Sequence, residues 1–362
     1  MTNEKLISVV IPCYNHEKYI EQTVLSVLQQ TYTNIELLVA DDCSTDASVE
    51  VLKSIQDPRL KVFPFEKNHG TVLTLNFLLE QARGEYIATL GSDDAFMPDK
   101  LEKQVRVMEA NPQLGAVFSW AEIVDGNNNP YQESGSLSEK IFQEENRSRG
   151  EWIQYMFSDA NHFCHSSAMV RRSVQDEIGL YRPAYRQLHD FEYWLRIICK
   201  YPVYVIPEKL TLYRRVDDQS SVSAGKSVKN TTRLYNEFNL IFCDLFCQMD
   251  AQLFAQAFGS TQGETGKDGS LILLKEKYLK LRALSLGGCR ILGAAQLFFV
   301  KYFNESVLSD FDERDQAELL KLYYEDTAQV SVEYPFYKQE HRGFLYRILR
   351  SLWRSVKCLI GR

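Results

Sequence analysis

The chain has 362 residues, of which 45% are hydrophobic and 12% aromatic, enough to form a core in one large domain or two. Its formal net charge of −7 at pH 7 argues against general nucleic-acid binding. The eight cysteines are scattered without a CxxC pair, which is typical of reduced thiols in a cytosolic protein.

The first 120 residues alternate short apolar runs with segments of helical spacing. In chain order we predict a strand at 7–11, a helix at 17–30, a strand at 35–40, a helix at 47–55, a strand at 60–65, a helix at 72–82, a strand at 86–90, a helix at 99–110 and a strand at 116–120. Such alternation predicts an α/β fold with a mostly parallel central sheet flanked by helices. Ligands of these sheets bind beyond the carboxyl ends of the strands.

The second half of the chain changes character. Polar residues at 125–150 indicate loops, and a further helix is predicted at 191–199. From residue 226 to residue 340 the pattern is helical with little strand. We therefore expect a first domain at 1–225 and a helical C-terminal region at 226–340.

Two pairs of adjacent carboxylates stand at predicted strand ends. Asp41 and Asp42 close the strand at 35–40, and Asp93 and Asp94 follow the strand at 86–90. Because neighbouring carboxylates repel each other, a fold tolerates them where a positive group is bound. At Asp93 and Asp94 a divalent cation that holds a phosphorylated ligand is one candidate, and a solvated turn with a helix cap is the alternative.

Short motifs follow one another in a fixed order over residues 6–220. They are SVVIPCYN at 8–15, LQQTY at 28–32, IELLVADDCSTD at 35–46, NHG at 68–70, ARGEYI at 82–87, SDD at 92–94 and HDFEYWLR at 189–196. In this order and spacing the chain resembles the family 2 glycosyltransferases of bacterial surface-polysaccharide synthesis. The resemblance implies the GT-A nucleotide-sugar-binding fold.

The resemblance also implies a binding site for the nucleotide of the donor. Tyr14 would stack on uracil or thymine, and the Asp42 carboxylate would accept the ring N–H. Pro12 and Asn15 belong to the same nucleotide-binding segment. Core packing is the alternative for Tyr14, and a turn or helix cap is the alternative for Asp41.

A metal site is implied at the second carboxylate pair. Asp93 would face the ribose or the metal, and Asp94 would coordinate Mg²⁺ or Mn²⁺ bridging the diphosphate. Ser92 stands where family members often have Asp, which removes one possible ligand. His165 falls where some relatives have a histidine near the donor phosphates, and an internally satisfied histidine is its alternative.

Asp190 matches the catalytic base of the family, and a simple helix cap is its alternative. His189 replaces the usual Glu before it, a departure that bears on acceptor contacts. Glu192 would face the acceptor or pair with an arginine. Since Leu75 and Val216 replace an Arg and a His that are common in relatives, diphosphate contacts are expected from elsewhere. Arg214 and Arg215 are the candidates for these contacts, with a solvated strand edge as their alternative.

The implied reaction is transfer of a sugar, with inversion, from a nucleoside-diphosphate sugar, expected to be UDP-linked, to a glycan hydroxyl. Asp190 would remove the proton of the attacking hydroxyl, and the metal at Asp94 would neutralise the leaving diphosphate. A catalytically silent nucleotide-sugar or glycan-binding module is the main alternative. A nucleotidyltransferase is a third, although its Gly-rich loop after the first strand is missing here.

The last residues, 341–362, contain no acid and are predicted to form one basic amphipathic helix. Its polar face carries Arg347, Arg350, Arg354 and Lys357, the pattern of a helix that lies in an anionic membrane surface. Docking on the helical region of the same chain is the alternative. A membrane location would suit a lipid-linked acceptor of O-antigen or capsule type.

The start of the chain shows no pattern of a signal peptide, and the longest apolar stretch, 291–300, is too short to span a bilayer. We therefore expect a cytoplasmic enzyme, peripheral on the inner face of the plasma membrane.

Overall fold

The computed structural model describes residues 4–131, 140–159, 161–215, 228–259, 267–286 and 293–329. The described residues form two compact units, which consist of 4–215 with 245–259, and of 228–244 with 267–286 and 293–329. The basic amphipathic helix predicted at 341–362 and Val216 lie outside the described residues.

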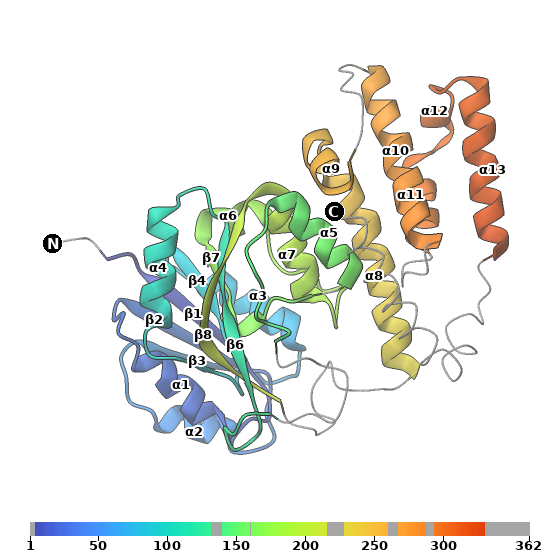
Figure 1. Cartoon of the computed structure of the whole chain (residues 1–362). Coiled ribbons are helices and arrows are strands. Elements are labelled where there is room, and N and C mark those ends of the chain that lie inside the picture. Colours follow the sequence, from blue (N-terminus) through green and yellow to red (C-terminus); the bar gives the residue numbers. More distant parts are fainter. Residues whose placement is uncertain are drawn as a thin grey trace. The chain divides into compact units, whose positions relative to one another are not determined.

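A mixed sheet forms the frame of the first unit (Figure 1). Its strands are β1 (Ile7–Cys13), β2 (Ile35–Asp41), β3 (Leu60–Pro64), β4 (Tyr86–Thr89), β5 (Ala95–Phe96), β6 (Ala116–Val124), β7 (Met169–Arg171) and β8 (Val203–Arg214). Within the described residues their order is β3-β2-β1-β4-β7-β6-β8-β5. The four strands β3, β2, β1 and β4 are parallel, as the sequence predicts. Strand β7 runs antiparallel to β4 and β6, and β8 runs parallel to β6 and antiparallel to β5.

Strand β8 escapes sequence prediction for a physical reason. It contains Pro207, Glu208 and Lys209, all exposed, so its apolar run is interrupted. Its pairing with β6 is irregular at Ser119 and Trp120, next to this polar segment. Irregular pairing of this kind bends a strand and breaks the period that sequence analysis detects.

The helices of the first unit lie between the strands in the chain. They are α1 (Ile20–Leu28), α2 (Ser48–Ser54), α3 (Thr71–Gln81), α4 (Lys100–Ala110), α5 (Arg149–Asp159), α6 (Arg172–Ile178), α7 (His189–Lys200) and α9 (Ala251–Phe258), with a 3₁₀ turn η1 (His165–Ser167). Side chains of α1, α2 and α4 join the buried cluster on one face of the sheet, and α3 packs against β1 and β2. Both faces of the parallel strands are therefore covered, as their continuous apolar runs predict.

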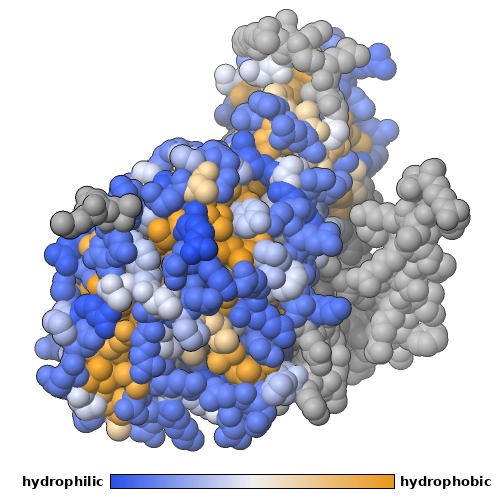
Figure 2. Space-filling view, turned by 60° about the vertical axis from the view of Figure 1, so that its left-hand side comes forward, coloured by the Kyte–Doolittle hydropathy of each residue, from blue (hydrophilic) through white to orange (hydrophobic). Residues whose placement is uncertain are grey.

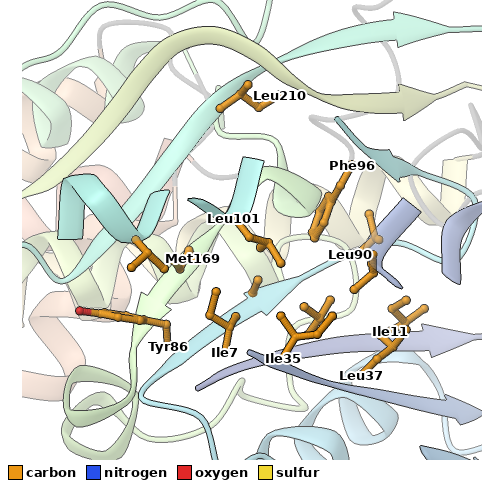
Figure 3. Close-up of a cluster of buried hydrophobic side chains, with 14 of the residues drawn as sticks. Ile7, Ile11, Ile35, Leu37, Tyr86, Leu90, Phe96, Leu101, Met169 and Leu210 are labelled. Carbon is orange, nitrogen blue, oxygen red and sulfur yellow. The ribbon is translucent and has the colours of Figure 1, made fainter. Parts of the chain in front are cut away.

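Alternating residues of the parallel strands build that core cluster (Figure 3). Ile7 and Ile11 of β1 lie beside Ile35 and Leu37 of β2, and Leu101 of α4 packs on the same cluster. All five side chains are at most 5% exposed. This packing fixes the register of the strands whose carboxyl ends carry the acidic pairs.

The second unit is helical, as the sequence predicts. It contains α10 (Lys267–Leu286), α11 (Ala294–Tyr302), α12 (Glu305–Leu308), α13 (Glu313–Gln329) and the first part of α8 (Val228–Gln248). Buried Tyr278 of α10 contacts the rings of Phe299 and Phe303. Arg282 of α10 pairs with the buried Asp326 of α13 through two hydrogen bonds of 2.7 and 2.9 Å. Ring packing and this ion pair therefore join α10 to α11 and to α13.

The surface of the face drawn in Figure 2 is mainly hydrophilic, with separate apolar areas between the polar side chains. Among the described helices, none combines the length and the apolar character that crossing a membrane requires.

Lys100, the first residue of α4, is fully buried without a carboxylate partner among the described residues. Its Nζ donates to Gln104 Oε1 at 2.6 Å and lies 3.9 Å from the centre of the Phe96 ring. Burial lowers the pKa of Lys100 from its ordinary value of 10.5 to about 7.

We expect Lys100→Met to change the pH dependence of the free energy of unfolding. Between pH 7 and 10.5 the unfolded chain carries the Lys100 proton and the folded chain does not, so wild-type stability gains from rising pH. The expected gain is at most about 1.4 kcal/mol per pH unit. The free energy of unfolding of the wild type minus that of the variant should therefore increase between pH 7.5 and pH 9.5, as measured by urea unfolding. Lys103→Met, on the same helix, is the control; a constant difference for Lys100→Met would show that Lys100 stays charged in the folded protein.

Candidate active site

The loops that follow β1, β2 and β4 are bonded to one another at the carboxyl edge of the sheet. The backbone N–H of Asn15 donates to Ser44 Oγ at 2.8 Å, and the N–H of Thr45 donates to Asn15 Oδ1 at 2.8 Å. His16 Nδ1 lies 2.7 Å from Ser92 Oγ. The structure thereby brings the loops that carry the two acidic pairs together.

The two carboxylates after β2 have different partners. Asp41 accepts from the N–H and the hydroxyl of Ser44 at 2.8 and 2.5 Å, which closes a turn. Asp42 accepts from the N–H groups of His69 and Gly70 at 2.7 and 2.8 Å, at the start of α3. Gly70 has a φ of +85°, which glycine adopts without strain. A carboxylate has about four acceptor positions, so Asp42 can still accept a hydrogen bond from a ligand.

The rest of the predicted nucleotide segment lies beside Asp42. Asp42 donates its backbone N–H to the carbonyl of Cys13, at 2.8 Å. Tyr14 follows directly and is 45% exposed, so core packing does not account for it. Pro12 is half-buried, and the side chain of Asn15 accepts a hydrogen bond from Thr45 of the neighbouring loop. An exposed aromatic ring next to a partly satisfied carboxylate is a suitable platform for a flat base.

The Asp93–Asp94 turn concentrates negative charge. Asp94 is buried, its Oδ1 accepts from the N–H of Arg214 at 2.7 Å, and its Oδ2 accepts from the hydroxyl of Ser166. Burial, together with the adjacent Asp93, raises the pKa of Asp94 well above its usual range. Asp93 is half-buried, and no described residue donates to its carboxylate. A cation at this turn would offset both effects.

The described residues contain no cluster of three or more His, Cys, Asp or Glu side chains that could hold a metal by themselves. Mg²⁺ commonly takes only one or two carboxylates from the protein and completes its octahedral shell with substrate phosphates and water. Asp93 and Asp94 therefore fit a cation that arrives with a diphosphate. The Ser92 hydroxyl is already bonded to His16.

The side chain of Arg214 holds the Asp93–Asp94 turn in place through hydrogen bonds. Its Nε donates to the carbonyl of Asp93 at 2.7 Å, and its Nη atoms donate to Asn128 Oδ1 at 2.7 Å and Gln22 Oε1 at 3.0 Å. Since the side chain is buried and its donors face protein acceptors, the structure assigns Arg214 to holding Asp93 in place. Arg215 is half-buried, and its guanidinium lies 5.6 Å from the centre of the Tyr131 ring.

Asp190 stands in the first turn of α7. The N-cap position of this helix is Leu188, so Asp190 does not occupy the capping position. Its Oδ1 accepts from the N–H of Phe191 and its Oδ2 accepts from Asn161 Nδ2, both at 2.8 Å. The carboxylate is half-buried, which keeps it available to a substrate.

Rings surround the start of α7. The ring of His165 lies 5.8 Å from that of His189, and its Nε2 lies 3.3 Å from the hydroxyl of Tyr181. Burial and the neighbouring His189 lower the pKa of His165 to about 4, so this imidazole is neutral at pH 7. Tyr181 stacks on Tyr193 with ring centres 4.1 Å apart.

Turn η1 connects the two halves of the site. Ser166 bonds Asp94, while His165, one residue earlier, faces the first turn of α7. Asp94 and the surroundings of Asp190 therefore share one short segment of chain.

Glu192 is buried on α7. Its Oε1 accepts from Arg196 Nε at 2.8 Å and lies 3.2 Å from Arg182 Nη1. Of the two roles considered for Glu192, the structure therefore shows the pairing with arginine.

Sequence reasoning missed several polar partners of the site: His16, Asn161, Ser166 and Tyr181. Asn76, on α3, binds the peptide of Tyr181 twice, through its Nδ2 at 2.8 Å and its Oδ1 at 3.0 Å. His16 directly follows the motif at 8–15, and this position is the signal that sequence analysis offers for it. Asn161 lies in no motif, and only the fold brings it to Asp190.

A family model and relatives found by sequence indicate the same family. The family model described as "Glycosyl transferase family 2" matches residues 8–179. The "Putative teichuronic acid biosynthesis glycosyltransferase TuaG" of Bacillus subtilis is 33% identical over 241 residues, 66% of this chain and 90% of the relative. The uncharacterized glycosyltransferase MJ1057 of Methanocaldococcus jannaschii is 30% identical over 243 residues, 66% of this chain and 79% of the relative. Residues 1–349 of S. aureus TarS, crystallised in complex with UDP-GlcNAc, have a TM-score of 0.57 at 17% identity, covering 89% of this chain and 88% of TarS 1–349; this likeness concerns the fold.

Proposed function

Because the chain belongs to family 2 of the glycosyltransferases, we propose that it transfers a sugar, with inversion, from a nucleoside-diphosphate sugar to a hydroxyl group of a glycan. The observation that carries the proposal is the placement of Asp190. Two hydrogen bonds orient its carboxylate, and η1 runs from its surroundings to the Asp94 turn. A base beside a diphosphate-binding turn is what single displacement at an anomeric carbon requires.

The donor nucleotide binds, in this proposal, between the loops after β1 and β2. Tyr14 stacks on the base and Asp42 accepts its ring N–H, which suits the imide of uracil. UDP-sugars are therefore the proposed donors. The TarS crystals, which contain UDP-GlcNAc in a similar fold, support a nucleotide sugar as the donor class.

The paired variants Asp42→Asn and Asp41→Asn should separate these roles. Both residues are buried, and the carboxylate of each accepts two hydrogen bonds from other residues of the protein. We expect Asp42→Asn to raise the donor KM about tenfold or more with little change in kcat, because the base lies far from the breaking bond. Asp41→Asn should leave the donor KM unchanged. An equal donor KM in the two variants would remove Asp42 from the nucleotide site.

Mg²⁺ or Mn²⁺ would be held by Asp93 and Asp94 together with the diphosphate. When bound, it would neutralise charge on the leaving nucleoside diphosphate. The protein keeps both carboxylates in place through Ser166 and Arg214, which bond Asp94 and the carbonyl of Asp93.

Asp190 removes the proton of the acceptor hydroxyl as that oxygen attacks the anomeric carbon of the sugar. The reaction passes through an oxocarbenium-like transition state, as in glycoside hydrolysis. One base suffices, because single displacement needs no covalent intermediate. His165 contributes no charge at pH 7, and its bond to Tyr181 helps fix the wall beside the base.

The acceptor is proposed to be a lipid-linked oligosaccharide in surface-polysaccharide biosynthesis. The name of the TuaG relative, which refers to teichuronic acid biosynthesis, supports a bacterial polysaccharide as the product class. The basic residues of 341–362 support a cytoplasmic enzyme that lies on the anionic inner face of the plasma membrane.

A panel of nucleotide sugars tests the function. Each is mixed with the full-length protein and Mn²⁺, and the shift in melting temperature is measured together with the released product. Release of nucleoside diphosphate with an acceptor present supports glycosyl transfer. Stabilisation without release identifies a silent binding module, and release of pyrophosphate identifies a nucleotidyltransferase.

A further inference from the structure

Asn161 follows α5 and makes two hydrogen bonds that together determine how its amide is turned. Its Oδ1 accepts from the N–H of Phe163 at 3.1 Å, and its Nδ2 donates to Asp190 Oδ2 at 2.8 Å. A backbone N–H can only donate, and an ionised carboxylate can only accept. The amide oxygen must therefore face Phe163, and the NH₂ group must face Asp190.

The other oxygen of Asp190 is held from the opposite side. Phe191, the next residue of α7, donates its N–H to Oδ1 at 2.8 Å. The carboxylate is thus fixed between one donor from its own helix and one from a segment 29 residues earlier. Each oxygen keeps acceptor capacity for a substrate hydroxyl.

We propose that Asn161 is the positioning residue of the base: it aims the Asp190 carboxylate at the acceptor hydroxyl and stabilises its negative charge with an uncharged donor. The assignment rests on the proposed function of Asp190. Asparagine is suited to this place because an aspartate would set two carboxylates against each other, and a residue without a donor would leave Oδ2 free to turn.

The titratable groups that surround Asp190 leave this role to Asn161. His165 of η1 is neutral at pH 7, and burial holds the Tyr181 hydroxyl in its protonated form by raising its pKa. His189 precedes Asp190 on α7, and Glu192 on the same helix is paired with Arg196. Asn161 is the side chain that donates directly to the carboxylate among the described residues.

Exchanging the two side chains tests the contact without any assay of activity. In Asn161→Asp two carboxylates lie opposite each other, and in Asp190→Asn two amide side chains compete to donate. Each variant should therefore lower the melting temperature by roughly 2–4 °C. The double variant restores one carboxylate and one amide with their places exchanged. It should therefore recover at least half of the summed loss. Strictly additive losses would show that the two side chains do not interact.

The dependence of turnover on pH tests the positioning role. For Asn161→Asp we expect the acidic limb of the kcat profile to move upward by about one pH unit or more, with an unchanged donor KM. Asn161→Ala, which adds no charge, should lower kcat about tenfold without moving the donor KM. The control is Asn34→Asp, at the amino end of β2 and remote from the site, which should change neither.

The outcomes separate this inference from the function on which it rests. One outcome is that the melting temperatures are coupled while neither Asn161→Asp nor Asn161→Ala changes the turnover of an active transferase. The contact would then be purely structural, and the positioning role would be overturned. If Asp190→Asn keeps full turnover, the base assignment itself fails, whatever the Asn161 variants do. Wild-type protein that releases no nucleoside diphosphate contradicts the proposed function, while the exchange experiment still decides whether the two side chains interact.

Discussion

Asp190→Asn should lower turnover about 10²- to 10⁴-fold and leave donor binding intact. The substitution keeps the size of the side chain and removes the carboxylate that we propose as the base for the acceptor hydroxyl. Donor binding should survive because Tyr14 and Asp42 belong to other loops of the site. Initial rates with saturating donor and acceptor measure the loss, and donor-induced thermal stabilisation checks that the variant is folded.

Asp99→Asn is the matched control for this experiment. Asp99 also stands at the start of a helix, α4, and it pairs with Lys103 at 2.7 Å. If Asp190 only supplied a negative charge to the start of α7, the two variants would resemble each other: slightly less stable and fully active. Near-normal turnover of Asp190→Asn would therefore show that Asp190 is not the base.

Asp94→Asn should lower turnover at least about a hundredfold and raise the metal concentration needed for half-maximal activity. The amide can still accept from the N–H of Arg214 and donate to Ser166 Oγ, so the turn should keep its shape. What the variant loses is one negative charge beside Asp93. Titrations with Mg²⁺ and Mn²⁺ at saturating donor measure the effect.

Glu36→Gln provides the comparison for loss of a buried carboxylate. Glu36 is 4% exposed, lies near the amino end of β2 and bonds Ser8 and Arg83. Its variant should lose stability without a change in metal dependence. Full activity of wild-type enzyme in excess chelator would contradict the metal-assisted scheme.

The parallel strands and the acidic pairs at their ends could be predicted because each strand is a continuous apolar run that ends in polar residues. Ile7–Cys13 and Ile35–Asp41 are buried along nearly their whole length, and such runs leave a clear trace in the sequence. Strand β8 leaves no such trace, because Glu208 and Lys209 interrupt it.

The partners of the site residues could not be predicted, because they come from distant segments. Arg214 is one of two candidates in the sequence for diphosphate contacts, and nothing in the sequence indicates that its side chain donates to the carbonyl of Asp93 and to the side chain of Gln22, 192 residues away. Ser166 and Asn161 reach Asp94 and Asp190 only when η1 and the end of α5 pack beside β4 and α7. A sequence carries the type of such residues, and the fold decides which of them meet.

The anomeric configuration of the product tests the central claim, single displacement with Asp190 as the base, most directly. The full-length enzyme is given an α-linked nucleotide sugar that stabilises it, together with an acceptor, and the new linkage is assigned by NMR from the first minutes of reaction. Attack by one deprotonated hydroxyl on the anomeric carbon predicts a β-linked product. An α-linked product would contradict the account, because retention requires chemistry that a single base at Asp190 does not provide.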